Sequence, residues 1–167
     1  MNSLTPRVAV YTGSFDPITL GHLSVIERSS RLFDRIVIGV GINVEKTALF
    51  SPEERVALVT QATEDYGNVE VRSFSELAVE FVRKCGSLIM VRGVRPLTDI
   101  AAEFTMMMAN RQLDAEIETV FLMADERFAH VSSSLIKQIT PLSDDDRLLR
   151  FVPESVIPAL RGKLGRE

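Results

Sequence analysis

Residues 11–22, Tyr-Thr-Gly-Ser-Phe-Asp-Pro-Ile-Thr-Leu-Gly-His, are the stretch that most constrains the fold of this chain. The apolar run 8–11 before it is typical of a short buried strand, and apolar residues recur at helical spacing after His22. The stretch is therefore predicted to be a strand-to-helix turn. Glycines let a ligand approach the backbone, and the unpaired N–H groups at a helix N-terminus attract anions. With side-chain donors from Ser14 and His22, the turn is predicted to bind an anionic group.

Composition limits the class of protein. A chain of 167 residues can build one real core, so we expect a single domain over residues 1–167. The net charge of −4 disfavours nucleic-acid binding as the main role. The single cysteine, Cys85, excludes an intramolecular disulfide and a cysteine-based metal cluster, which fits a reducing cytosol. No run reaches the length of a signal peptide or membrane span, so we expect a cytoplasmic protein without membrane contact.

Apolar strand-like runs alternate with helical patterns along the chain, which favours an α/β fold with a mainly parallel sheet. The predicted strands are 8–12, 36–40, 69–71, 87–91 and 119–123. Two predicted helices cover residues 21–33 and 97–113. A third begins after Ser51, which is predicted to be its N-cap, with Glu54 completing a capping box, and a fourth runs from Ser75 to Gly86 with Leu77 facing inward. The last two begin at Ser132 and at Pro153, and the second of these ends at about residue 163. On the predicted helix 97–113, Ile100, Phe104 and Met108 form an apolar stripe. Residues 144–146, all Asp, are predicted to form a solvated turn.

Polar and basic residues follow several predicted strands. In open parallel sheets, ligands bind beyond the carboxyl ends of the strands. These ends carry Ser14 and His22, then Lys46, then Arg92 and Arg95, and finally His130 with the serines 132–134. Such a set is typical of a site for several phosphates. The P-loop, the dinucleotide fingerprint and the nucleophile elbow are absent, and two histidines without nearby acidic residues disfavour a protein-held zinc. The residues therefore fit phosphate chemistry without a covalent intermediate.

The ordered set resembles the phosphopantetheine adenylyltransferases, a bacterial family of the (H/T)xGH nucleotidyltransferase superfamily. The matching motifs are Gly-Ser-Phe-Asp-Pro at 13–17, Thr-x-Gly-His at 19–22, Lys46, Arg-Gly-Val-Arg at 92–95, Glu103 with Asn110-Arg111, and Ser-Ser-Ser-Leu-Ile-Lys at 132–137. They span about residues 7–164. The resemblance implies a Rossmann-like fold of five mainly parallel strands with helices on both faces.

The resemblance also implies an activity. The adenylyl group of ATP is transferred to 4′-phosphopantetheine by direct in-line attack, giving dephospho-coenzyme A and pyrophosphate. Mg²⁺ accompanies the nucleotide, and no metal is bound by the protein alone. Relatives are homohexamers inhibited by coenzyme A, so we expect both properties here.

Individual roles follow from the same resemblance. The implied catalytic residues are His22 on the α-phosphate, Ser14 on the attacking phosphate, Lys46 between them, and Arg95. The implied ATP-binding residues are Ser14, Phe15, His22, Gly93, Val94, Arg95, Glu103, Phe128, Ala129, His130, Val131, Ser132, Ser133 and Ser134. The implied phosphopantetheine-binding residues are Ser14, Lys46, Ala78 and Arg92.

Some of these residues also have simpler structural interpretations. Glu103 could simply pair with Arg111 or another cation, and the serines could only cap a helix. Residues 106–108, all Met, fit a core or a subunit contact. Another nucleotidyltransferase, acting on nicotinate mononucleotide or glycerol phosphate, is an alternative, although such enzymes usually carry His at the position of Thr19. A non-catalytic nucleotide-binding protein is a second alternative. The sequence departs from the family pattern at Thr12, at the alanine pair 101–102 and at His130.

Overall fold

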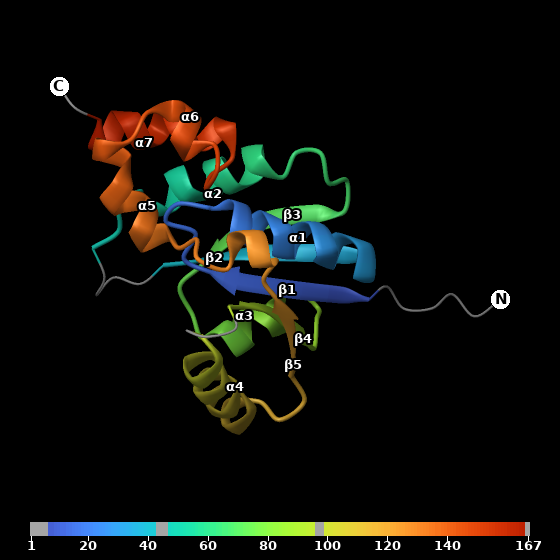
Figure 1. Cartoon of the computed structure of the whole chain (residues 1–167). Helices are drawn as coiled ribbons and strands as arrows, with labels where there is room; N and C mark the ends of the chain where they lie inside the picture. The colour runs from blue at the N-terminus through green and yellow to red at the C-terminus, as the bar shows by residue number, and fades with distance from the viewer. Residues whose placement is uncertain (1–6, 43–46, 96–98, 166–167) are drawn as a thin grey trace.

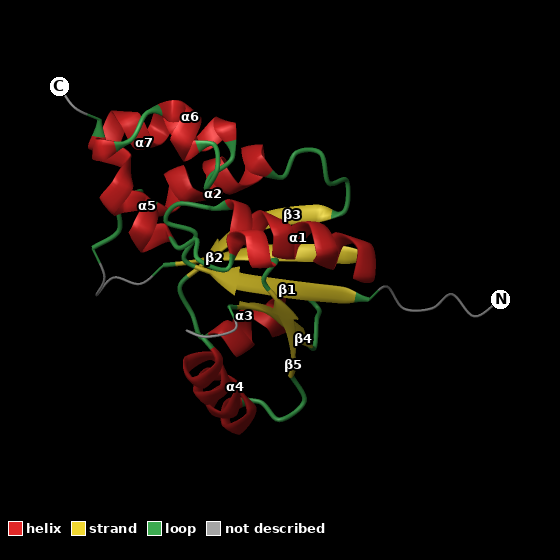
Figure 2. Cartoon of the chain, viewed as in Figure 1, coloured by secondary structure: helices red, strands yellow, loops and turns green. Residues whose placement is uncertain are grey.

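The computed structural model describes residues 7–42, 47–95 and 99–165. Within these residues, five strands form one sheet in the order β3-β2-β1-β4-β5, and every neighbouring pair is parallel. Figure 2 shows the strands side by side. They are β1 (Val8–Gly13), β2 (Arg35–Gly41), β3 (Val69–Phe74), β4 (Ile89–Val94) and β5 (Glu118–Met123). The order reverses between β1 and β4, which is where ligands bind in open α/β sheets.

Helices cover both faces of the sheet, as the sequence predicts. Figure 1 shows α3 and α4 on the opposite side of the sheet from α1, α2 and the C-terminal helices. The helices are α1 (Leu20–Leu32), α2 (Pro52–Ala62), α3 (Ala78–Lys84), α4 (Ile100–Leu113), α5 (Ser133–Ile139), α6 (Asp145–Leu148) and α7 (Ile157–Leu164). Three short 3₁₀ turns lie at Glu126–Phe128, Thr140–Leu142 and Glu154–Val156. Within the described part of the chain, no helix is long and apolar enough to cross a membrane.

The alternation of side chains along β1 divides the core into two clusters. Ala9 and Tyr11 pack with apolar side chains of α1, α2 and α5–α7. Val10 points the other way and packs with Phe81 and Val82 of α3. Both faces of the central strand are therefore buried, which is why its sequence is a continuous apolar run rather than an alternating one.

One helix start and one helix end follow the predicted capping chemistry. The Ser51 hydroxyl accepts from the Glu54 N–H at 3.2 Å, and the Glu54 carboxylate accepts from the Ser51 N–H at 2.7 Å. This is the predicted capping box at the start of α2. Gly86, at φ +69°, ends α3 in the left-handed conformation that glycine adopts without a Cβ penalty.

The structure corrects two local predictions and changes the meaning of a third. Ser75 does not cap α3: β3 continues to Phe74, and the N-cap position falls on Leu77, which is 52% exposed. The acidic run is not a plain turn, because the Asp144 carboxylate accepts from the Arg147 N–H and starts α6. The predicted apolar stripe of α4 exists, but its side chains, among them Phe104 at 55%, are exposed on the chain.

Candidate functional site

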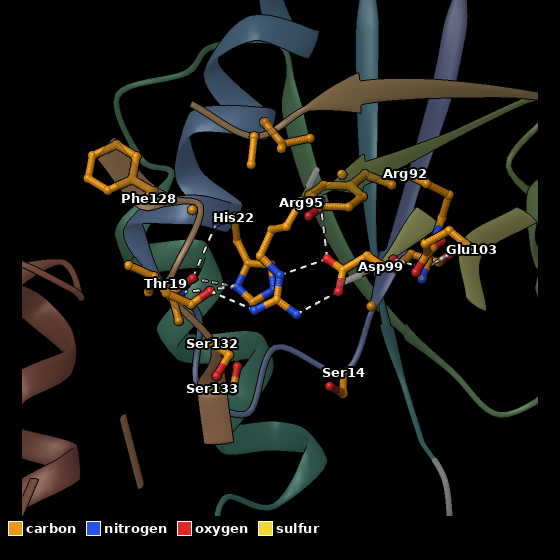
Figure 3. A pocket seen from close by; sticks show the side chains of 18 residues that line it. Ser14, Thr19, His22, Arg92, Arg95, Asp99, Glu103, Phe128, Ser132 and Ser133 are labelled. Carbon is orange, nitrogen blue, oxygen red and sulfur yellow. Dashed lines mark hydrogen bonds and ion pairs between the residues drawn. The ribbon is translucent and has the colours of Figure 1, made fainter. Parts of the chain in front are cut away.

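A cavity of about 280 Å³ lies beyond the carboxyl ends of β1 and β4. The turn after β1, the first turn of α1, the end of β4, the first turns of α4 and the N-terminal end of α5 all contribute to its wall. Figure 3 shows His22, Arg95 and Asp99 close together in it, with Ser132 and Ser133 along one side. The predicted convergence of strand ends is therefore present at the switch point of the sheet.

His22 is held by the cap of its own helix. The Thr19 hydroxyl accepts from the His22 N–H at 3.4 Å, and the Thr19 N–H donates to His22 Nδ1 at 3.1 Å. This is a capping box in which histidine replaces the usual Glu or Gln. Because Nδ1 is an acceptor here, the neutral imidazole carries its proton on Nε2, and the ring is a hydrogen-bond donor at that atom.

The surroundings of His22 keep it neutral. Burial of the ring, together with the positive charges of Arg95 and Arg92, lowers the pKa of His22 to about 4. If the ring took up a second proton, its positive charge would be repelled by both guanidiniums. At pH 7 His22 is therefore a neutral donor beside two arginines, which suits contact with a phosphoryl oxygen without proton transfer.

Arg92 spans the junction of β1, β4 and α4. Its Nε and Nη2 donate to the two carboxylate oxygens of Glu103 at 2.7 and 2.6 Å, and its Nη1 donates to the Thr12 carbonyl at 2.6 Å. The Thr12 hydroxyl accepts from the same nitrogen at 3.2 Å. The cation that Glu103 pairs with is therefore Arg92 rather than Arg111. Thr12, a departure from the family pattern, adds a hydroxyl contact to this arginine.

Arg95 is oriented in a similar way. Its Nε and Nη2 donate to Asp99 at 2.7 and 2.8 Å, and its Nη1 donates to the Val131 carbonyl at 3.2 Å. Carboxylate partners hold both guanidiniums in fixed planes at the cavity wall. An incoming phosphate would exchange for, or add to, these carboxylate contacts.

The turn between β1 and α1 is anchored by a buried carboxylate. Asp16 accepts from the Leu49 and Phe50 N–H groups, each at 2.9 Å, and from the Lys137 ammonium of α5. Burial alone would raise the pKa of Asp16, but these donors together hold it below its ordinary value. Ser133 adds a bond from its hydroxyl to the Pro17 carbonyl at 2.8 Å. The turn is thus joined directly to the N-terminal end of α5.

A second hollow of about 210 Å³ adjoins the first. The two share Thr12, Gly13, Arg92 and Glu103, while apolar side chains including Phe74 and Met106 line the second alone. Ala78 lies in this second hollow. Arg92 therefore stands between a polar cavity and a largely apolar one.

The structure brings most of the predicted site residues together. The first cavity is lined by Ser14, His22, Arg92, Gly93, Arg95, Glu103, Phe128, Val131, Ser132 and Ser133. Five of the predicted ATP-binding residues do not line it: Phe15 and Val94 are buried in the core, Ala129 is half-buried, and His130 and Ser134 are exposed. The His130 ring instead packs edge-on against Phe151. Lys46 lies outside the described residues. Ser132 caps α5 and Ser133 bonds Pro17, so both serines also have structural roles.

Sequence reasoning missed three residues with contacts at the site. Asp99 orients Arg95, and its position four residues before Glu103, on the same helical face, was an available signal. Asp16 and Arg55 anchor the turn through buried polar contacts, and their neighbours in the sequence do not indicate these partners. Among the described residues, no group of three or more His, Cys, Asp or Glu side chains could hold a metal ion.

Comparisons with known proteins agree with this geometry. The cytidylyltransferase-like family model matches residues 10–139. A phosphopantetheine adenylyltransferase of Rhodopirellula baltica is 66% identical over 162 residues, covering 96% of this chain and 90% of the relative. One of Clostridium perfringens is 43% identical, covering 95% of each.

Solved structures of low sequence identity share the fold. A putative nicotinate-nucleotide adenylyltransferase of Vibrio parahaemolyticus superposes with a TM-score of 0.70 at 19% identity, covering 98% of this chain and 97% of that one. A nicotinic acid mononucleotide adenylyltransferase of Plasmodium falciparum gives 0.73 at 13% identity, covering 95% and 96%. The fold is thus that of nucleotidyltransferases, and by its sequence the chain belongs to the phosphopantetheine adenylyltransferase family of cytidylyltransferase-like proteins.

Proposed function

We propose that this protein transfers the adenylyl group of ATP to 4′-phosphopantetheine, giving dephospho-coenzyme A and pyrophosphate. The observation that carries the proposal is Arg92, which stands between the polar cavity of His22 and the apolar hollow of Ala78. The polar cavity suits the phosphates of ATP, and the apolar hollow suits the arm of the acceptor. The two phosphates would then meet near Arg92.

The reaction is a direct displacement. An oxygen of the acceptor phosphate forms a bond to the α-phosphorus of ATP, the bond from that phosphorus to the bridging oxygen breaks, and pyrophosphate leaves with that oxygen. Negative charge builds on the α-phosphoryl oxygens during the step. His22 and Arg95 supply fixed donors to that charge, and Ser14 holds the attacking phosphate. Lys46 is proposed to bridge the two phosphates.

Mg²⁺ is proposed to arrive as the complex with ATP. The acidic residues of the cavity, Asp99 and Glu103, are engaged by Arg95 and Arg92, and such pairs are a poor start for a site held by the protein alone. Phosphate oxygens would supply most ligands of the ion. Phe128 to Ser134 are proposed to contact the nucleotide, and of these Phe128, Val131, Ser132 and Ser133 line the cavity.

The acceptor decides between this function and its rivals. Purified protein with ATP, Mg²⁺ and 4′-phosphopantetheine should release pyrophosphate, whereas nicotinate mononucleotide and glycerol phosphate should not. Turnover of either of these in preference to 4′-phosphopantetheine would identify a different nucleotidyltransferase. Binding of ATP without turnover of any acceptor would indicate a non-catalytic nucleotide-binding protein.

We also propose that the protein is a cytoplasmic homohexamer and that coenzyme A inhibits it. Residues 1–167 are proposed to act as one nucleotidyltransferase domain. The exposed apolar side chains of α4 support an assembly, since Ile100, Phe104 and Met108 are each about half exposed on the single chain. Coenzyme A carries the same pantetheine arm as the acceptor and would compete for the second hollow. Light scattering should give six times the chain mass of 18.6 kDa, and a monomeric mass would reject the hexamer.

A further inference from the structure

Arg55 of α2 is a buried charged residue without an assigned role. It is 4% exposed, and its Nη1 donates to the carbonyls of Ser14 and Gly41, each at 2.8 Å. Its Nε is buried and has no hydrogen-bond partner among the described residues. Within the described part of the chain, the hydrogen bonds of the guanidinium thus go to main-chain carbonyls and none goes to a carboxylate. Burying a charged side chain without an opposite charge costs folding free energy, so a functional reason for Arg55 should exist besides packing.

The two carbonyls belong to residues of the two cavity walls. Ser14 lines the polar cavity and Gly41 lines the apolar hollow. They lie at the ends of neighbouring parallel strands, where Gly13 of β1 is in register with Val40 of β2. One nitrogen of Arg55 therefore ties together the strand ends that carry both walls.

We propose that Arg55 is a positioning residue for the transfer reaction: by clamping the Ser14 and Gly41 carbonyls it fixes the Ser14 hydroxyl against the acceptor phosphate. This inference rests on the proposed function and adds a residue to it. The carbonyl and the side chain of Ser14 share one Cα, so holding the carbonyl limits rotation of that residue. Because no carboxylate of the described chain pairs with the guanidinium, its positive charge also favours an anion at the turn.

A purely structural clamp elsewhere in the molecule provides a matched control. Arg161 of α7 donates to the carbonyls of Thr140 and Ser143 at 2.7 and 2.6 Å, and its Nε donates to the Asp145 carboxylate at 2.8 Å. It lines neither cavity. Arg161→Met therefore removes two bonds to main-chain carbonyls, together with the Asp145 ion pair, away from the site, and it reports the kinetic effect of lost stability alone.

The experiment compares Arg55→Met, Arg55→Lys and Arg161→Met with the natural protein by steady-state kinetics. Affinity for ATP is measured separately by calorimetry with a non-hydrolysable analogue. Arg55→Met should lower kcat/KM for 4′-phosphopantetheine at least tenfold and leave ATP affinity within threefold. Arg55→Lys, whose ammonium can donate to both carbonyls, should recover most of the loss. Arg161→Met should keep natural kinetics at a temperature well below its Tm.

Natural acceptor kinetics in folded Arg55→Met would overturn the inference, and so would an equal loss in Arg161→Met. If Arg55→Met does not fold, Arg55→Gln replaces it, because its shorter neutral side chain loses the charge and the double contact. Natural kinetics in that variant also overturn the inference. Absence of pyrophosphate release by the natural protein would reject the proposed function itself, which the same assay reveals before any variant is compared.

Discussion

The backbone N–H of Thr19 donates to Nδ1 of His22 at 3.1 Å, and this single contact fixes which nitrogen of the ring carries the proton. Nδ1 is occupied as an acceptor, so the donor of the neutral ring is Nε2. The Thr-x-Gly-His pattern thus has a simple physical content. Threonine caps the helix, and the cap sets both the orientation and the tautomer of the histidine.

His22→Ala should lower kcat on the order of 10²–10³-fold, by analogy with the loss of one oxyanion donor. The proposed contact of Nε2–H with the α-phosphate would strengthen as charge builds there, so ATP affinity should change little. Thr19→Val keeps the backbone N–H and should cost far less. Steady-state kinetics and ATP calorimetry check this. Weakened ATP binding with natural kcat would contradict the role.

The lowered pKa of His22 predicts a pH-dependent stability. Between about pH 4 and 6.5 the unfolded chain protonates this histidine and the folded chain does not, so folding stability due to His22 falls as pH falls through that range. The size is on the order of 2–3 kcal/mol. Urea unfolding of the natural protein and His22→Gln at pH 7.5 and 4.5 should show a smaller pH-dependent loss in the variant. Parallel pH curves for the two proteins would rule out the shift.

Arg92→Lys tests whether the planar guanidinium matters as well as its charge. Lysine keeps the charge but loses the two-point contact with Glu103 and the bonds to Thr12. KM for 4′-phosphopantetheine should rise roughly 10-fold or more, as for the loss of a bidentate, charge-assisted contact. Thr12→Val, which removes only the hydroxyl contact, should raise it by a smaller factor. An unchanged KM in Arg92→Lys would show that charge alone suffices.

The sheet, its strands and the helix starts could be predicted because local signals specify them. Five apolar runs gave five strands, and Ser51 with Glu54 gave a capping box. Local signals gave the wrong prediction where tertiary contacts determine the structure. Ser75 looked like a cap, but β3 continues to Phe74 and leaves α3 to start at Ala78. The α4 stripe had the right period, yet periodicity does not say what covers a face.

The residues of the site also fall into those that local signals predict and those that tertiary structure determines. His22, Arg92 and Arg95 were predictable because the ends of parallel strands converge on one edge. The partner of Arg92 was not, since Glu103 reaches it only through the packing of α4, whereas Asp99 lies four residues after Arg95 in the sequence. Arg55 and Asp16 were further out of reach, because their acceptors and donors lie far away in sequence. His130 was placed with the nucleotide by resemblance, whereas its ring packs against Phe151.

Asp16 and Lys137 should be strongly coupled. Asp16→Asn leaves the half-buried Lys137 ammonium and the two backbone donors without the charge of their partner, and it should lower the free energy of unfolding by about 2–4 kcal/mol at pH 7. Lys137→Met should also destabilise, and the double variant should lose less than the sum, with a coupling of about 1–3 kcal/mol. The pKa of Asp16 is lowered, so its contribution is present above its ordinary pKa of 3.8 and is lost at lower pH. Additive losses in urea unfolding would exclude a direct pair.

Gly39 of β2 is predicted to tolerate no side chain. A Cβ there would lie 2.5 Å from Cε1 of Phe81 and 3.0 Å from Cε1 of Phe74. Those two rings are themselves stacked, with their centroids 4.5 Å apart. Gly39→Ala should therefore cost about 1–3 kcal/mol through overpacking between β2 and α3.

Gly67→Ala is the matched control for Gly39→Ala, since a Cβ at Gly67 meets no atom within 4 Å and its φ lies outside the left-handed range. That variant should stay within about 0.5 kcal/mol of the natural protein or gain slightly, because alanine reduces the freedom of the unfolded chain. Urea midpoints of the two variants give the comparison directly. Equal midpoints would mean that the Phe74–Phe81 stack moves aside at little cost, and that the α3 face of the sheet is packed more loosely than the contact distances imply.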